Sequence, residues 1–105
     1  MDYQITEINF DEASEYEDQL SQFVLWYSDL EEAGVDEVWI AKSNDSIVGF
    51  LTKNIDGDCV AIEVAEDLQG NGIASSLCEE AWCFDPEDDQ CPEFWEKMSE
   101  LRESL

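Results

Sequence analysis

The chain has 105 residues, of which 28 are Asp or Glu and only 4 are Lys or Arg, so its formal net charge is −24. Such a field repels nucleic acid and anionic membranes, and binding to a phosphate backbone requires a basic patch that this chain lacks. Direct nucleic-acid binding is therefore excluded, whereas cationic amines and basic protein surfaces are favoured as partners. An apolar fraction of 44% is enough for a packed core, which argues against global disorder.

The 4 cysteines and the absence of histidine narrow the chemistry further. No C-x-x-C pair occurs, so we expect no metal site. The first residues are acidic, and no apolar run approaches the ~20 residues that cross a bilayer, so we expect neither a signal peptide nor membrane contact. We expect a cytoplasmic protein with one domain over residues 1–105 and reduced thiols, although Cys83 and Cys91 could pair on oxidation.

The first third of the sequence predicts a strand followed by a helix. Apolar and polar residues alternate over residues 3–10, which is typical of a strand. Apolar residues then recur at intervals of three and four over residues 11–33, which predicts one amphipathic helix that ends at Gly34, with a break near Ser28. Acidic residues in its first turn suit the positive end of the helix dipole.

The middle of the chain predicts three antiparallel strands. Their ranges are 37–42, 46–52 and 59–64, joined by turns at 43–45 and 54–58. A helix over 72–82, an acidic loop over 84–90 and a last helix over 92–101 follow, the last with Pro92 in its first turn. These elements alternate in a way that indicates an α/β (mixed α+β) fold.

The crossover at residues 62–74 carries the strongest chemical signal. A strand stops there, a Gly-rich turn follows, and a helix starts at once, so the first helical N–H groups lack internal partners. Gly70 and Gly72 allow close approach of phosphate oxygens, which predicts an anion site suited to a pyrophosphate. A turn without any ligand is the alternative. The pattern is neither a P-loop, because no Gly-Lys-Ser/Thr follows, nor a dinucleotide fingerprint, because the preceding strands are antiparallel.

The segment Gln69-Gly-Asn-Gly-Ile-Ala74 resembles the Gln/Arg-x-x-Gly-x-Gly/Ala motif of GNAT-superfamily N-acetyltransferases, with Val64 five residues ahead as in that family. The order of elements is similar as well, and Phe94-Trp-Glu-Lys-Met98 looks like the Phe-Tyr-Glu-Lys stretch of the family's fourth helix. The resemblance covers residues 3–83 well and 92–101 loosely. It implies a central, mostly antiparallel sheet flanked by helices, with a reduced C-terminal half.

The resemblance also implies acetyl-CoA as the bound substrate and assigns roles to residues. The main chain of Val64 would bind the pantetheine arm and polarise the thioester carbonyl. Glu63, or as a second choice Glu66, would deprotonate the incoming ammonium. An ordinary solvent-facing strand residue is the alternative for Glu63. The residues that would hold the coenzyme are Val64, Gln69, Gly70, Asn71, Gly72, Ile73 and Ala74.

The chain departs from the family pattern in two places. Trp95 stands where the family usually has a general-acid Tyr, and an indole does not donate that proton usefully. The fifth strand would have to come from residues 83–91, which contain Pro86 and four acids and do not read as a central strand. The coenzyme slot would then lack one wall, and the loop 69–71 has no Lys or Arg to attract an anion.

Three functions fit these observations. We expect an N-acetyltransferase that acts on a cationic amine, either a polyamine, another small-molecule amine or a protein lysine. The alternative is a catalytically inactive acidic protein of GNAT ancestry that acts as a DNA mimic and blocks a nucleic-acid-binding protein, as phage or mobile-element inhibitors do. The charge could also reflect adaptation to high salt. A second copy could supply the missing strand, which makes a homodimer one expected arrangement.

Overall fold

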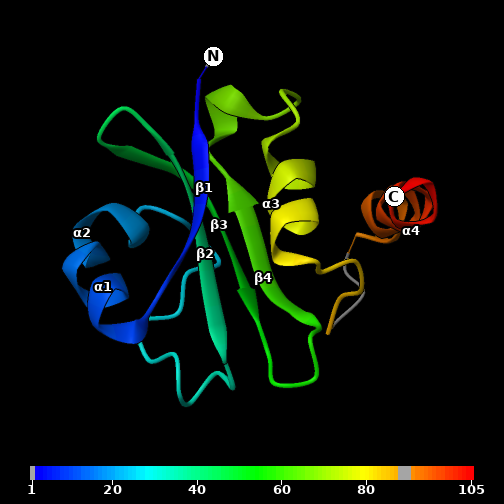
Figure 1. Ribbon diagram of the computed structural model, residues 1–105. Coiled ribbons are helices and arrows are strands. Elements are labelled where there is room, and N and C mark those ends of the chain that lie inside the picture. The colour runs from blue at the N-terminus through cyan, green and yellow to red at the C-terminus, as the bar shows by residue number, and fades with distance from the viewer. Residues whose placement is uncertain (1, 88–90) are drawn as a thin grey trace.

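A computed structural model describes residues 2–87 and 91–105 and places one antiparallel sheet between two layers of helices (Figure 1). The sheet order is β1-β2-β3-β4. The elements are β1 Gln4–Ile8, α1 Phe10–Glu15, α2 Glu17–Leu20, β2 Glu37–Ser43, β3 Ser46–Lys53, β4 Cys59–Val64, a 3-10 turn Glu66–Leu68, α3 Ile73–Ala81 and α4 Pro92–Ser104. The expected mixed α+β class, with a mostly antiparallel sheet, is confirmed.

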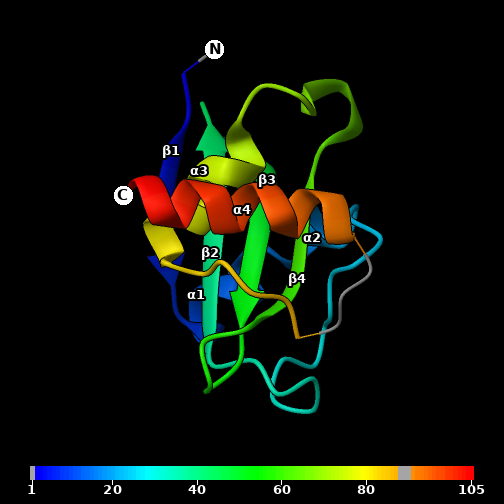
Figure 2. The ribbon, with the colours of Figure 1, turned by 90° about the vertical axis from the view of Figure 1, so that its right-hand side faces the viewer.

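Each face of the sheet has its own hydrophobic core. Under α1 and α2, Leu20 and Phe23 pack on Val38, Ile40 and Phe50. On the opposite face α3 lies directly on the sheet, and Figure 2 shows α4 crossing outside α3. Trp95 and Met98 are the buried residues of α4, and they join the same core as Leu77 of α3. The sheet is therefore covered on both sides, and α4 is the outermost layer.

The N-terminal strand is shorter than predicted because a helix cap begins at Asn9. The Asn9 Oδ1 atom accepts a hydrogen bond from the Glu12 N–H at 2.8 Å, and the Glu12 Oε1 atom accepts one from the Asn9 N–H at 3.3 Å. This reciprocal pair is a capping box, which ends β1 at Ile8 and starts α1 at Phe10. The predicted strand over 3–10 is thus wrong at its end.

The single helix predicted over 11–33 is also wrong. α1 ends where Tyr16 leaves the helical region, with φ −95° and ψ 8°, and α2 ends after only one turn. Val24 and Leu25 then donate their N–H groups to the Glu63 carboxylate instead of to carbonyls four residues earlier. The apolar residues whose spacing suggested a helix do not form one buried face, since Leu20 and Phe23 are buried whereas Val24 is 89% exposed.

The three-stranded meander is confirmed with small changes at its ends. β2 and β3 each extend one residue beyond the prediction, to Ser43 and Lys53, and β4 has the predicted limits. Asn44 takes a positive φ of 57° in the turn between β2 and β3, a conformation that Asn tolerates better than most residues. Bulges lie at Ala41/Lys42 in the β2–β3 pair and at Thr52/Lys53 in the β3–β4 pair.

α3 packs closely on the sheet over a glycine. A Cβ on Gly49 would come within 3.1 Å of the Glu63 carbonyl oxygen and 3.5 Å of the Leu77 side chain. The contact with the Glu63 carbonyl oxygen is tighter than ordinary packing, so a side chain at position 49 would force the backbone of β4 to shift, whereas the contact with Leu77 of α3 is an ordinary one. The absence of a Cβ at position 49 therefore lets β4 lie close to β3 beneath α3.

The acidic segment after α3 is described as far as Glu87, and the predicted loop residues 88–90 lie outside the described residues. Within it, the Cys59 N–H donates to the Asp85 carbonyl and the Glu87 N–H donates to the Cys59 carbonyl, both at 2.8 Å. These two bonds form an isolated parallel bridge between Cys59 and Pro86. In the described part of the chain, this bridge is what stands in the place of a fifth strand. α4 then runs to Ser104, beyond the predicted end at 101.

Candidate active site

The first turn of α3 offers unpaired amides, as the sequence predicts. The first backbone bond into the helix is donated by Ser76 to the Gly72 carbonyl, so the N–H groups before Ser76 have no intrahelical acceptor. Gly72 is the N-cap in a left-handed conformation, and no described side chain caps the helix there. The Asn71 and Gln69 side chains turn away, toward the carbonyls of Leu68 and Val64. The α3 amides are thus available to an anion.

The Gly-rich turn leaves open space beside these amides. Gly70 and Gly72 have φ values of 86° and 82°, and a Cβ at either position would meet no atom within 4 Å. Glycine suits both positions because of its backbone conformation, since an L-residue is strained at such φ values. The open space beside the two glycines can hold a ligand. This geometry fits a pyrophosphate lying against the turn.

The main chain of Val64 faces the open edge of the sheet. The Ala65 N–H donates to the Val48 carbonyl of β3, and Glu63 pairs with Phe50. Because N–H and C=O groups alternate in direction along a strand, those of Val64 point away from β3. The Gln69 Nε2 atom, which donates to the Val64 oxygen at 3.1 Å, confirms that direction. The Val64 N–H is therefore directed toward the outer edge of the sheet.

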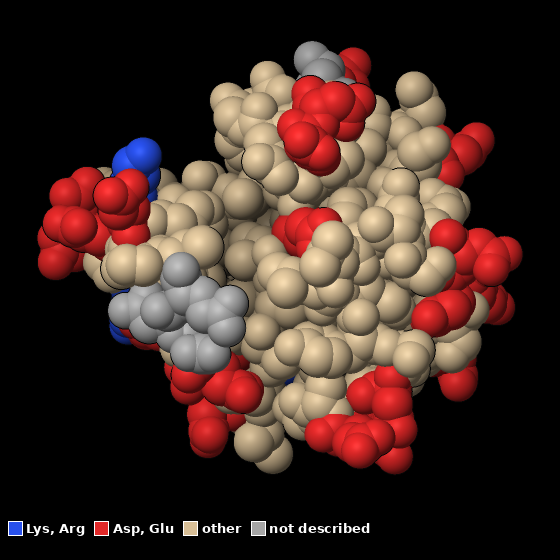
Figure 3. Space-filling model, turned by 180° about the vertical axis from the view of Figure 1, so that it is seen from behind, with Lys and Arg blue, Asp and Glu red and all other residues tan. Residues whose placement is uncertain are grey.

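A pocket of about 850 Å³ joins the Val64 edge to the α3 amides. Figure 3 shows a hollow on this face whose visible walls are mostly uncharged residues; one acidic patch lies beside the hollow, and the other acidic residues lie toward the edge of the view. Of the predicted site residues, all but Asn71 line it. They are Glu63, Val64, Gln69, Gly70, Gly72, Ile73 and Ala74. The volume lies in the range of small-molecule sites, and the opposite wall comes from α4.

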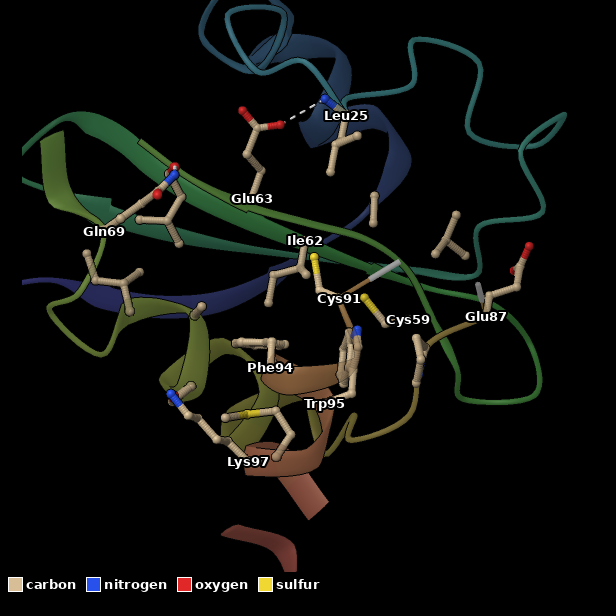
Figure 4. A pocket seen from close by; sticks show the side chains of 18 of the residues that line it. Leu25, Cys59, Ile62, Glu63, Gln69, Glu87, Cys91, Phe94, Trp95 and Lys97 are labelled. Atoms are coloured by element: carbon tan, nitrogen blue, oxygen red, sulfur yellow. Dashed lines mark hydrogen bonds between the residues drawn. The ribbon is translucent and has the colours of Figure 1, made fainter. Parts of the chain in front are cut away.

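Glu63 lies in the pocket wall with both carboxylate oxygens engaged. Oε1 accepts the Leu25 N–H at 2.8 Å and Oε2 accepts the Val24 N–H at 3.2 Å (Figure 4). The residue is half-buried and is not the free solvent-facing side chain considered from the sequence alone. Its carboxylate orders the loop after α2 beside the pocket, and its role as a base stays a prediction. Glu66 is exposed and does not line the pocket.

Trp95 occupies the pocket floor as a core aromatic. It is 8% exposed and lies edge to face with Phe94, with ring centroids 4.9 Å apart. Its indole therefore serves packing, and the described residues place no Tyr of α4 in this pocket, because the helix contains none.

Two thiols, those of Cys59 and Cys91, also line the pocket. A hydrogen bond to Cys83, followed by burial, raises the pKa of the Cys59 thiol far above its usual range. Burial raises the pKa of Cys78, which lies behind the pocket in the core, to about 12. With raised pKa values, the thiols of Cys59 and Cys78 stay protonated near neutral pH and are poor nucleophiles. All four cysteines are free, and Cys83 is buried whereas Cys91 is exposed.

Sequence reasoning missed the α4 wall of the pocket. Phe94, Lys97 and Met98 line it together with Leu25 and Tyr27 from the loop after α2. Positions 94, 97 and 98 share one helical face by their spacing, so the pattern could have shown that they act together. It could not have shown that this face turns toward the Gly-rich turn, since that depends on how α4 docks.

Two further features bear on the class of site. Within residues 2–87 and 91–105, no cluster of His, Cys, Asp and Glu has the arrangement needed to hold a metal ion. Over the same described ranges, every helix is too short or too polar to cross a membrane.

Known proteins share this fold. A model of the acetyltransferase (GNAT) family matches residues 3–98. A ribosomal-protein-alanine N-acetyltransferase from Brucella melitensis biovar Abortus 2308 is similar in structure, with 20% identity, a TM-score of 0.56 and coverage of 95% of this chain and 89% of its own. AAC(6')-Iy, solved with the bisubstrate analogue CoA-S-monomethyl-acetylneamine, has 16% identity, a TM-score of 0.61 and coverage of 99% and 88%.

An aminoglycoside acetyltransferase from an uncultured soil metagenomic sample is also similar, with 20% identity and a TM-score of 0.56 over 76% of this chain and 69% of its own. Comparison with curated protein sequences gives no significant match. The structural neighbours support the fold, and the family model extends over nearly the whole chain. The chain therefore belongs to the acetyltransferase (GNAT) family.

Proposed function

We propose that the chain is an acetyl-CoA-dependent N-acetyltransferase whose acceptor is a cationic amine. The observation that carries this proposal is one pocket in which uncapped α3 amides, the outward Val64 main chain and the Glu63 carboxylate all take part. Amides at a helix start suit a pyrophosphate, and an outward N–H suits a developing oxyanion. Bound acetyl-CoA would supply the acetyl group as an activated thioester.

The acceptor side of the proposal rests on charge. Glu63 and Glu87 are the carboxylates of the described pocket wall, and the net charge of −24 raises the local concentration of cations around the protein. Glu63 lies beside Leu25 and Tyr27, so an amine that enters over that loop meets a carboxylate next to apolar side chains. This setting favours an alkyl ammonium over a neutral or anionic acceptor.

The proposal predicts a large rise in melting temperature with acetyl-CoA, because a ligand bound only by the native state stabilises it. At a ligand concentration a hundred times the dissociation constant, the gain in unfolding free energy is about 2.7 kcal/mol. Incubation with acetyl-CoA and spermidine, neamine or a lysine-rich peptide should then give a product heavier by one acetyl group, detected by mass spectrometry. Glycerol, which is neutral and has no amine, is the negative control for the acceptor.

Two observations favour a second candidate, the non-catalytic DNA mimic. Among the described residues, the pocket wall beyond Cys59 has a single parallel bridge in place of a fifth strand, and Trp95 stands where the family usually has a general-acid Tyr. This candidate predicts no shift with acetyl-CoA. It predicts instead a salt-sensitive complex with a basic DNA-binding protein that is displaced by duplex DNA. The two functions are thus separated by the same pair of binding experiments.

A further inference from the structure

The distribution of the few cations in this chain is uneven. Three of the 4 basic side chains are engaged away from the pocket. The contacts are Lys42 Nζ over the Tyr16 ring at 5.1 Å, Lys53 Nζ with the Ala81 carbonyl at 2.7 Å and Glu37 at 3.7 Å, and Arg102 with Asp85 at 3.7 Å. Lys97 is the remaining cation, and the described residues offer it no ion-pair partner within 4.0 Å.

Lys97 lines the same pocket as the α3 amides. It is exposed on α4, one turn after Phe94 and next to the buried Met98. It is the sole basic residue among the described residues of the pocket wall. In Figure 4, Lys97 and Gln69 lie toward one end of the pocket and Glu87 toward the other. The positive charge is therefore on the side of the Gly-rich turn.

A pyrophosphate faces an unfavourable field at this protein. A helix N-terminus offers about half a positive charge, whereas the chain carries a net charge of −24. Glu63 and Glu87 add negative charge to the pocket wall itself. An ammonium at the α3 end of the pocket offsets these charges locally, since a charge-assisted hydrogen bond to phosphate is stronger than a neutral one.

Building on the proposed function, we propose that Lys97 is the binding residue that pairs with the pyrophosphate of the coenzyme, opposite the α3 amides. The Gly-rich turn and α3 then hold the phosphates from one side, and α4 supplies the counter-charge from the other. The site thereby gains from α4 the charge that the loop 69–71 does not provide. The chemistry recognised is a diphosphate diester at the end of a pantetheine arm.

Calorimetric titration with three probes tests this assignment. CoA has the pyrophosphate and a 3'-phosphate, dephospho-CoA has the pyrophosphate alone, and pantetheine has neither. Lys97→Met should weaken CoA and dephospho-CoA alike, by about tenfold, and leave pantetheine unchanged. Lys97→Arg should restore most of the affinity. The salt dependence of CoA binding should become shallower in Lys97→Met, because one screened charge pair is gone.

Arg102→Met is the matched control. It removes one positive charge from the same helix, outside the pocket and at an exposed ion pair. Its effect on CoA binding should stay within about twofold, because Arg102 is outside the pocket wall and belongs to an exposed ion pair with Asp85. Equal losses in the two methionine variants would overturn the assignment to Lys97 and point to the overall field. A loss for CoA but not for dephospho-CoA would assign Lys97 to the 3'-phosphate and overturn the pyrophosphate contact.

The outcomes also separate this inference from the proposed function. Wild-type binding of CoA with unchanged binding by Lys97→Met removes the inference and leaves the acetyltransferase proposal intact. Absence of CoA binding by the wild type removes both. Unfolding in urea should be similar for the wild type and both methionine variants, since the two side chains are exposed.

Discussion

Replacing Gly72 by Asp is expected to weaken CoA binding by at least about a hundredfold, or about 2.7 kcal/mol. Gly72 is the α3 N-cap at φ 82°, and a side chain there would project into open space. An Asp carboxylate at a helix start accepts the first amides, so it would take the place of the phosphate and repel it. Titration calorimetry with CoA measures the loss.

Gly57→Asp is the control for this change. Gly57 lies in the turn between β3 and β4 and has φ 87°, and a Cβ at this position would likewise meet no atom within 4 Å. It does not line the pocket. Both variants add one negative charge and one strained residue, at a cost of about 1 kcal/mol in unfolding free energy. CoA affinity that falls equally in both variants, or in neither, would contradict the assignment of the α3 amides.

Glu63→Gln is expected to lower kcat/KM at least about a hundredfold with whichever amine the wild type acetylates, because a general base contributes at least that factor. The amide keeps the volume of the side chain and one oxygen for the Leu25 N–H, but it cannot take a proton. Loss of a charged acceptor for the Val24 N–H should cost about 1 kcal/mol of unfolding free energy. Steady-state kinetics and urea unfolding separate the two effects.

Glu66→Gln is the companion variant, since it removes the same charge from an exposed residue three positions away that does not line the pocket. Its kcat/KM should stay close to that of the wild type. If Glu63→Gln unfolds more easily but keeps its kcat, Glu63 only anchors the loop after α2. If Glu66→Gln is the slow variant, the base was assigned to the wrong carboxylate.

The sheet and α3 could be predicted because their signals are local. β-branched residues in β2 and β3, with a turn at Asn44 and Asp45 between them, fix the hairpin within a few positions. Gly72 marks the start of α3, because only a residue tolerant of positive φ fits there. The same locality made the α3 amides visible from the sequence, whereas Val64 was identified only through the resemblance to the family.

The segment between α1 and β2 could not be predicted, because its conformation depends on a distant residue. Its apolar spacing suits a helix, yet the Val24 and Leu25 N–H groups donate hydrogen bonds to Glu63, which lies 38 or more positions later in the sequence. Trp26 also packs edge to face on Phe50, with ring centroids 5.3 Å apart. Tertiary contacts thus outweigh a periodic pattern over this stretch.

The α4 wall of the site was hidden for a similar reason. The period of Phe94, Lys97 and Met98 defines a face, but the docking of that face depends on the path of the segment that precedes the helix. The bridge between Cys59 and Pro86 directs that path along β4, and a single bridge has no sequence signature. The sequence therefore showed Lys97 only as part of the stretch 94–98 that resembles the family's fourth helix.

The amide signals of ¹⁵N-labelled protein during a CoA titration test most directly whether the amides at the start of α3 bind the coenzyme. If they do, the largest shifts occur at Gly70, Gly72, Ile73 and Ala74, with smaller shifts near Val64 and Lys97. Those residues line one pocket, whereas a second hollow at the β1 edge is lined by Tyr3, Gln4, Ile5, Thr6, Ser76 and Glu80. Shifts confined to the second hollow, or no shifts at the start of α3 at saturating CoA, would contradict coenzyme binding by these amides.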